Sequence, residues 1–232
     1  MPLRTDELAK TVDQTVLDPN ASPADVEAAA RRARELHLAS LCVLPRFVAA
    51  AAEELRGSDV KVCCVIGHPD GASPSREKTR AAEVALADGA GELELVLDIA
   101  ALRRADVRGI RDDLVGFTRT MRMRVANGGR GAIVLKAVLG TPVLDDKLIR
   151  LASRMVERAE VDFAQTTTDE SVAPALAEVE LLRESLPESI GVKAVGSLET
   201  VAELQDLVVG GAARVGSPTA ADLLNDAALV RA

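Results

Sequence analysis

The feature of this sequence that most constrains its fold is an alternation, repeated eight times, of short β-branched runs with Ala-, Arg- and Glu-rich stretches. The short runs have the length and the Val and Ile content of buried strands. They predict strands at residues 11–15, 39–43, 61–66, 92–99, 132–139, 161–166, 191–194 and 213–216. Two folds satisfy strict alternation over a chain of this length: an open doubly wound sheet and a closed (β/α)8 barrel.

The stretches between the runs have the spacing of amphipathic helices. They predict helices at residues 23–36, 45–56, 75–88, 110–126, 145–159, 175–184, 198–209 and 220–230. Ser22 is expected to cap the first of these, with Pro23 at its first helical position. Gly89 and Gly210 stand where helix C-caps are expected. No Pro- or Ser-rich linker and no repeat of 20–50 residues divides the chain, so we expect one domain, residues 1–232.

Polar residues near the strand ends favour the barrel. In a barrel all strands face one interior and active-site side chains gather at their carboxyl ends, whereas a buried parallel sheet is nearly continuous in Val, Ile and Leu. The polar residues on or just after predicted strands are Asp13, Cys42, Glu94, Asp98, Lys136, Gln165, Thr167 and Lys193. For any one of them alone, a capped strand end is an equally good explanation. Together they predict an α/β protein with a single (β/α)8 (TIM) barrel.

Composition excludes several classes of protein. The net charge of −8 and the pI near 5.0 argue against nucleic-acid binding, because such a chain lacks a broad positive field. No run is long and apolar enough to cross a membrane, and residues 1–7 contain no apolar core of a secretion signal. Three cysteines, Cys42, Cys63 and Cys64, make a poor disulfide framework and fit the reducing cytoplasm.

Three segments carry chemistry. Residues 191–196 and 133–139 each place a lysine, Lys193 and Lys136, inside an apolar strand. A buried lysine must be paired, neutral or functional, although a single one at a strand end can extend to solvent. Strict alternation in residues 92–98 puts Glu94 and Asp98 on one face. Lysines and carboxylates at one barrel mouth suit acid–base chemistry on a carbonyl substrate.

These segments resemble the deoxyribose-phosphate aldolases, a family of class I Schiff-base aldolases on a (β/α)8 barrel. The similar segments are residues 13–17, 41–47, 62–69, 89–96, 135–141, 161–168, 191–200 and 213–217, in the family's order. The opening Asp-Gln-Thr-Val-Leu, for example, is similar to the family's Asp-x-Thr-x-Leu. The resemblance implies an aldolase-family carbon–carbon lyase that uses no cofactor and no metal.

The departures from the family pattern are as informative. The family's Schiff-base lysine lies in a Phe-x-Lys-Thr-Ser-Thr-Gly segment, and that position is Gln165 here. An amide cannot form an imine with a carbonyl substrate. Lys193 matches the family's second lysine and Glu94 matches its acid–base aspartate, while Gly140 replaces a glutamate.

Lys193 is expected to be mostly an ammonium ion. A Schiff-base lysine must be partly neutral near pH 7, and a neighbouring ammonium helps to lower its pKa. Glu94 favours the charged form of Lys193. Lys136 could repel it, but strands five and seven are two ladder spacings apart, roughly 9–10 Å, so this repulsion is expected to be weak. Polarising a carbonyl or stabilising an enolate therefore suits Lys193 better, with imine formation at Lys193 kept as an alternative.

The expected phosphate site is also altered. The family binds phosphate through the N–H groups of glycine-rich turns after strands six, seven and eight. Residues at these turns here are Asp169, Glu170, Gly196, Ser197, Glu199, Gly216, Ser217 and Pro218. A carboxylate about 5 Å from a phosphate costs roughly 3 kcal/mol per charge pair at an effective dielectric of 20. We therefore expect no use of 2-deoxyribose 5-phosphate, unless both acids of the first turn point outward to solvent.

The leading hypothesis is a diverged aldolase that makes or breaks a C–C bond, or does related enolate chemistry, on a small unphosphorylated carbonyl compound. Glu94 and Asp98 are expected to act as acid–base groups, and Lys193 and Lys136 as electrostatic stabilisers. The expected substrate-binding residues are Asp13, Thr15, Cys42, Gln165, Thr167, Asp169, Gly196, Ser197, Gly216 and Ser217. The substrate is the expected partner, and the Ala-rich helices would suit a homodimer as well as packing against the barrel.

Two alternatives stay open. A catalytically silent relative could bind a metabolite or an active paralogue, because loss of the covalent lysine also fits loss of activity. A metal-dependent aldolase has weaker support, since His37 and His68 form no ligand set with nearby acids. His68 could face the mouth. Cys63 and Cys64 point to opposite faces of a strand, and Cys42 is expected to be a small inward packing residue.

Overall fold

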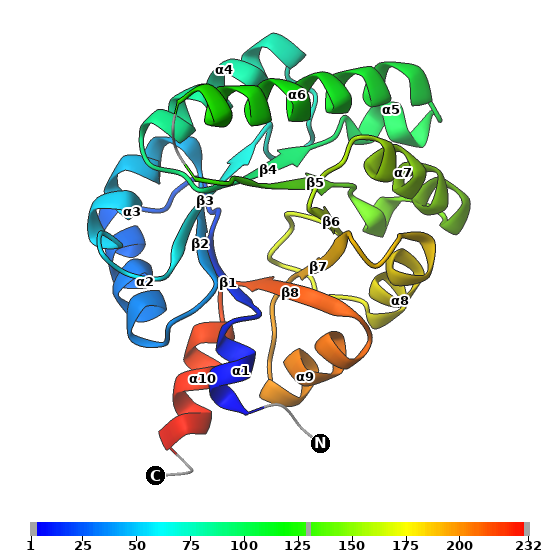
Figure 1. Ribbon diagram of the computed structural model, residues 1–232. Coiled ribbons are helices and arrows are strands. Elements are labelled where there is room, and N and C mark those ends of the chain that lie inside the picture. The colour runs from blue at the N-terminus through cyan, green and yellow to red at the C-terminus, as the bar shows by residue number, and fades with distance from the viewer. Residues whose placement is uncertain (1–3, 129–130, 230–232) are drawn as a thin grey trace.

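The computed structural model describes residues 4–128 and 131–229, and Figure 1 views it along the barrel. Eight parallel strands close in sequence order, with β8 paired to β1. The strands are β1 (Val12–Val16), β2 (Ser40–Val43), β3 (Lys61–Ile66), β4 (Glu92–Val96), β5 (Val134–Val138), β6 (Phe163–Gln165), β7 (Gly191–Val195) and β8 (Ala212–Ser217). The predicted (β/α)8 barrel is confirmed.

Helices surround the ring of strands (Figure 1). They are α1 (Thr5–Ala9), α2 (Pro23–Glu35), α3 (Val48–Glu54), α4 (Ser75–Ala87), α5 (Ile99–Arg103), α6 (Val107–Asn127), α7 (Asp146–Arg158), α8 (Leu176–Ser185), α9 (Val201–Val209) and α10 (Ala220–Leu229). None of those within residues 4–128 and 131–229 is long and apolar enough to cross a membrane.

Small aliphatic residues build the layer between the helices and the barrel. On α2, Val26, Ala30 and Ala33 are fully buried. Ser22 caps this helix as predicted: its hydroxyl accepts a hydrogen bond from the backbone of Asp25, with Pro23 at the first position. Because the inward side chains are not needed to hold the helices, the barrel interior can carry polar groups.

Strands four and six are shorter than predicted. β4 ends at Val96 because the next residues turn into α5, a helix that the hydrophobic pattern did not predict, capped by Asp98. β6 begins only at Phe163, since the Asp162 carboxylate accepts the hydrogen bond of the Leu135 N–H at 2.7 Å in place of a backbone carbonyl. Side-chain hydrogen bonds thus decide both boundaries.

Three predicted helices begin differently, and one of them, predicted at 110–126, begins earlier, at Val107 of α6. The segment 45–56 opens with a 3-10 turn, Pro45–Phe47, before α3. α9 begins at Val201 rather than at residue 198, because Thr200 forms a capping box with Glu203. Its C-cap is Gly210 in a right-handed conformation.

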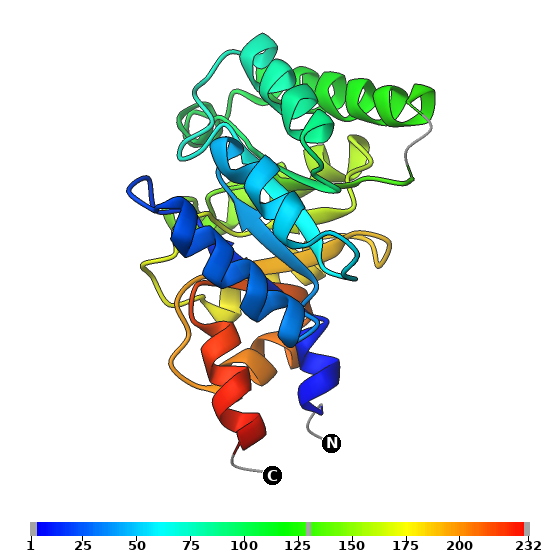
Figure 2. The same cartoon turned by 90° about the vertical axis from the view of Figure 1, so that its left-hand side faces the viewer.

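The first and last helices meet on one side of the barrel. α1 and α10 lie side by side in both views (Figure 1, Figure 2). α1 was not predicted, and the last residue of the predicted helix 220–230 lies outside the described residues. α1 and α10 are neighbours because closure of the barrel brings β1 beside β8.

Candidate active site

Six charged side chains meet inside the barrel. The residues of this ionic cluster are Asp13 on β1, Glu92 and Glu94 on β4, Lys136 on β5, Lys193 on β7 and Arg214 on β8. Five have side chains at most 2% exposed, and only Arg214 reaches solvent, with 18% exposure. The cluster confirms that the interior is polar.

Lys136 holds three carboxylates. Its Nζ lies 2.6 Å from Asp13 Oδ2, 2.8 Å from Glu92 Oε2 and 3.2 Å from Glu94 Oε1. Adjacent pairing of β4 with β5 sets Glu94 directly beside Lys136. Its ammonium donates hydrogen bonds to Asp13 Oδ2 and Glu94 Oε1, while the contact with Glu92 Oε2 is an ion pair without a hydrogen bond.

Lys193 contacts two of the same oxygen atoms. Its Nζ lies 2.8 Å from Asp13 Oδ2 and 2.5 Å from Glu94 Oε1. The two lysine nitrogens are therefore no farther apart than two hydrogen-bond lengths. The expectation of weak repulsion between Lys136 and Lys193 was wrong, because the long side chains converge although their strands do not touch.

Both lysines are nevertheless held as ammonium ions. Burial lowers the pKa of Lys193, but the charges of Asp13 and Glu94 outweigh burial and the net pKa is raised. Burial raises the pKa of Glu94, but Lys193 and Lys136 bring it down to about 2. The pKa of Asp13 lies well below its usual range because its three cationic partners outweigh its burial.

The cluster is electrically balanced, with three carboxylates and three cations. Arg214 closes it at one end, with Nη1 2.5 Å from Asp13 Oδ1 and Nη2 3.5 Å from Glu92 Oε1. Neither Glu92 nor Arg214 was predicted. The alternation of side chains along a strand could have predicted that both face the interior. Glu92 shares a strand face with Glu94, and Arg214 shares one with Gly216.

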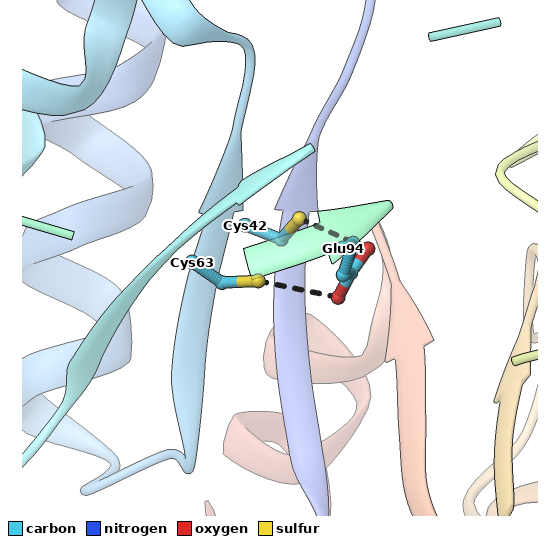
Figure 3. Close-up of side chains that lie close together, drawn as sticks. All are labelled: Cys42, Cys63 and Glu94. Atoms are coloured by element: carbon cyan, nitrogen blue, oxygen red, sulfur yellow. Dashed lines mark hydrogen bonds between the residues drawn. The ribbon is translucent and has the colours of Figure 1, made fainter. Parts of the chain in front are cut away.

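Two thiols complete the surroundings of Glu94. Cys42 and Cys63 each donate to one oxygen of its carboxylate, at 3.3 Å (Figure 3). Burial raises the pKa of the Cys63 thiol. Cys64 points elsewhere, to the Val65 carbonyl, so the expected opposite orientation of Cys63 and Cys64 is confirmed. Cys42 faces inward as expected.

These thiols with Glu94 form a group whose ligand atoms lie within 4.8 Å of one another, the arrangement of a possible metal site. The surroundings do not fit a metal ion. Two ammonium groups already bond the Glu94 carboxylate, and a metal would need thiolates, whereas burial keeps Cys63 protonated. A dication would add charge to a cluster that is already balanced.

A polar layer lies between the cluster and the barrel mouth. Gln165 is fully buried; its Nε2 donates to the Thr167 carbonyl at 2.8 Å, while its Oε1 has no partner. The Thr15 hydroxyl, on β1, is also buried and unpartnered. Buried polar atoms without a partner in the protein are rare, so these two atoms are available to bind a polar molecule.

Asp98 lies outside the cluster. Its Oδ1 accepts a hydrogen bond from the Ala101 N–H at 2.8 Å and caps α5. The expectation that Asp98 would share a strand face with Glu94 fails because β4 ends before it.

An open pocket of about 510 Å³ occupies the barrel mouth. Its lining comes from the segments after β1, β3, β4, β5 and β6: Leu17, Asp18, Pro19, His68, Pro69, Ile99, Gly140, Pro142, Val143, Thr167, Thr168, Asp169, Glu170 and Ser171. Among the described residues, this lining has three carboxyl groups and neither lysine nor arginine. No member of the ionic cluster lines the pocket, which ends above the polar layer.

The two acids after β6 point in different directions. Asp169 is exposed, and its Oδ1 accepts from the Ser171 N–H at 2.9 Å. Glu170 is half-buried and turned inward: its Oε2 accepts from the Leu17 N–H at 3.3 Å, and its Oε1 is buried without a partner. Burial raises the pKa of Glu170. The sequence predicted an acid at this position, near the expected phosphate turns, but it did not predict that the side chain of Glu170 turns inward.

The turns after β7 and β8 do not reach the pocket. The loop after β6 packs on them: the Ser197 N–H donates to the Val172 carbonyl at 2.9 Å, and a Cβ on Gly196 would lie 2.3 Å from the same oxygen. The expected substrate-binding residues Gly196, Ser197, Gly216 and Ser217 therefore lie outside the pocket.

The N–H groups of these turns are already bonded within the protein. The Leu198 N–H donates to Thr219 Oγ1 and the Thr219 N–H to Ser217 Oγ, both at 3.2 Å. Gly216 faces the barrel interior, where a Cβ would lie 2.8 Å from Lys193 Cε. Only a residue without a side chain leaves room for Lys193 there.

The fold, the interior lysines and the mouth pocket together define an aldolase-type (β/α)8 barrel. Comparison with known proteins shows which family within this class the chain belongs to. The chain is 36% identical to the deoxyribose-phosphate aldolases of Bacillus mycoides and Bacillus cereus over 222 residues, 95% of this chain and 96% of each relative. No family model matches it. The chain belongs to the deoxyribose-phosphate aldolase family and is thus an aldolase-family carbon–carbon lyase.

Solved structures agree with this assignment. The aldolase QR15 superimposes with a TM-score of 0.86 at 27% identity, covering 97% of both chains. The deoxyribose phosphate aldolase from Aeropyrum pernix, described as tetrameric, superimposes with a TM-score of 0.85 at 26% identity, covering 98% of this chain and 93% of its own.

Proposed function

We propose that this lyase makes or breaks a C–C bond in a small carbonyl compound that carries no phosphate group, and that it does so without a Schiff base. The observation that carries the proposal is the charge of the mouth pocket, whose described lining includes Asp18, Asp169 and Glu170 but no lysine or arginine. Each carboxylate about 5 Å from a phosphate costs roughly 3 kcal/mol per charge pair at an effective dielectric of 20.

The turns after β7 and β8 support the same substrate class. A phosphate bound there would need free backbone donors. The Ser197 and Leu198 N–H groups are instead taken by Val172 and Thr219, and Pro218 has no N–H to offer. A phosphate would have to break these hydrogen bonds before making its own.

Two side chains support the proposed absence of an imine. Gln165 holds an amide where the resemblance places the reactive lysine, and amides do not add to carbonyls. Lys193 remains an amine, but its raised pKa keeps it protonated, and an ammonium is no nucleophile. Lys193 and Lys136 would instead supply positive charge beneath the reacting carbonyl, balanced by Asp13 and Glu94.

The unpartnered atoms of the polar layer would receive the substrate. Gln165 Oε1 can accept from a substrate hydroxyl, and the Thr15 hydroxyl can donate to a carbonyl oxygen. Thr167 lines the pocket directly above and would orient the same molecule. The carbonyl then approaches the field of the lysines without displacing the cluster.

The test is a pair of substrates that differ only in phosphate. We expect cleavage of 2-deoxyribose or other unphosphorylated 3-hydroxyaldehydes, and no saturation by 2-deoxyribose 5-phosphate at micromolar concentration. Borohydride should trap no adduct in an active enzyme. A trapped Lys193 adduct would establish the imine alternative, whereas micromolar saturation by the sugar phosphate would refute the substrate class.

The same assay separates the enzyme from a catalytically silent relative. Glu94→Gln and Lys193→Ala should abolish turnover while circular dichroism remains unchanged. If no carbonyl compound is turned over by the unmodified protein, binding of a metabolite becomes the better description.

We also infer a cytoplasmic location and a homo-oligomer. The unpaired Cys42, Cys63 and Cys64 fit a reducing compartment. The Aeropyrum pernix relative is described as tetrameric, and light scattering of this protein would give its own state.

A further inference from the structure

Enolate chemistry needs a group that takes a proton from carbon and returns it to oxygen. A carboxyl suits this task when its pKa lies near the working pH and a substrate can reach it. The carboxylates of the ionic cluster fail both conditions. Asp13 and Glu94 are fully buried, bonded to two ammonium groups each and absent from the pocket wall. They are fixed counter-ions.

The acids of the mouth pocket differ from one another. Asp18 and Asp169 are exposed and close local turns, accepting from the Asn20 N–H at 2.7 Å and from the Ser171 N–H at 2.9 Å. Glu170 alone among the three is half-buried. One of its oxygens accepts the long hydrogen bond from Leu17, and the other is enclosed without a partner.

Resting on the proposed function, we propose that Glu170 is the acid–base residue of this site, exchanging a proton with substrate in the barrel mouth. In the aldol direction its carboxylate takes an α-proton: the C–H bond breaks, an O–H bond forms on the carboxylate, and the electron pair moves into the enolate. The enolate carbon then attacks a second carbonyl, and the Glu170 carboxylic acid returns its proton to the new alkoxide. Atoms and charge balance without another reactant.

The surroundings of Glu170 suit this role. Burial raises its pKa above the usual glutamate value. The Thr15 hydroxyl on β1 and the Leu17 N–H lower this pKa, and of the charged groups that face the carboxyl, Lys193 on β7 lowers the pKa and Glu94 on β4 raises it, so the effect of burial exceeds the lowering contributions. When the surroundings move the pKa values of two carboxyl groups in opposite directions, one group keeps its charge and the other can exchange a proton. Here the pKa of Glu94 is lowered and the pKa of Glu170 is raised, so Glu170 is the group suited to proton exchange.

The experiment measures α-proton exchange of propanal in D2O by ¹H NMR, which needs no knowledge of the natural aldol substrate. We expect Glu170→Gln to slow exchange about 10²-fold or more, the usual contribution of a general base. Glu170→Asp should recover part of the rate. Glu180→Gln, an exposed position on α8, is the matched control and should exchange at the unmodified rate.

Two results would overturn the inference. One is exchange that survives Glu170→Gln, above all if substitution of His68, the other titratable side chain of half-buried character in the pocket, removes it. The other is the absence of exchange in the unmodified protein. Retro-aldol turnover that persists in Glu170→Gln would leave the proposed function intact and reject only Glu170.

A second measurement is independent of turnover. Carboxyl ¹³C shifts of the unmodified protein minus those of Glu170→Gln give the titration of Glu170 alone. We expect a midpoint above that of an ordinary glutamate, together with a shift on adding propanal. A midpoint at or below the ordinary value overturns the assignment even in an active enzyme.

Discussion

At the scale of single residues, the protein joins two lysines to three carboxylates where no solvent reaches them. Burying any one of these charges alone would be costly, so each depends on its partners. Lys136 is central, because it touches Asp13, Glu92 and Glu94. The cluster thus has a structural role whatever its part in the chemistry.

Lys136→Met should destabilise the fold by about 3–5 kcal/mol, the usual cost of removing one partner from a buried ion pair. Methionine is close to lysine in volume, so the lost free energy of unfolding reports the carboxylates that are left without their cation. Urea unfolding measures the change. Lys147→Met, at an exposed position on α7, should stay within about 0.5 kcal/mol. An equally small effect at Lys136 would contradict the charge assignment.

Stability should fall on acidification because of Glu94. Its pKa is about 2 in the folded state against an ordinary 4.5, so its contribution is complete above pH 4.5 and is lost as the pH falls toward 2. The difference corresponds to about 3 kcal/mol. Unfolding midpoints of the unmodified protein and Glu94→Gln between pH 6 and 2.5 should converge. Parallel curves would show that Glu94 titrates normally.

At the scale of elements, short side-chain hydrogen bonds decide where the secondary structure stops. Thr200, Asp162 and Asp98 each replace a backbone partner or cap a helix. The loop after β6 is held to the turn after β7 by a backbone hydrogen bond, from the Ser197 N–H to the Val172 carbonyl. These local bonds move residues into or out of the site without changing the barrel.

Substitutions of Asp98 can distinguish a helix-capping role of this residue from a catalytic one. Asp98→Ala should cost about 0.5–2 kcal/mol of stability, whereas Asp98→Asn should retain both the cap and the turnover. Thermal unfolding and a turnover assay on the two variants measure this. Loss of turnover in a stable Asp98→Asn protein would restore the acid–base role expected from the sequence.

Gly196 tests the packing of the loop after β6. In Gly196→Ala the new Cβ would lie 2.3 Å from the Val172 carbonyl and 2.8 Å from Pro174, so the loop must shift. Overpacking of this kind costs about 1–3 kcal/mol. Gly116→Ala, in α6 with open space around it, should instead stabilise by about 0.5–1 kcal/mol. Equal effects on the urea midpoint would argue against a tightly packed loop.

At the scale of the whole molecule, the net charge of the chain is −8, and three of its acids line the described part of the pocket in place of a positive funnel. Such a field disfavours anionic substrates both on approach and when bound. The rest of the fold is that of the relatives, with a TM-score of 0.86 to an aldolase. Under the proposed function, the features that distinguish this chain are the charge of the mouth pocket and the amide of Gln165.

Salt should reveal this field. Raising the ionic strength from 0.01 to 1 M shortens the screening length from about 30 to about 3 Å. The KM of any phosphorylated carbonyl that reacts at all should then fall several-fold, while that of its unphosphorylated counterpart should stay constant. Steady-state kinetics with both compounds checks this, and a rising KM for the phosphate would indicate a positive site.

The sequence by itself determined the barrel and the inward polar positions, because strand periodicity and alternation are local properties. It also predicted the charged state of Lys193 and an acid after β6. Only the tertiary structure decided that Lys136 and Lys193 share the same two oxygens, that Asp98 caps a helix and that Glu170 turns inward. Those facts depend on side-chain reach and on hydrogen bonds between distant segments, which no spacing along the chain specifies.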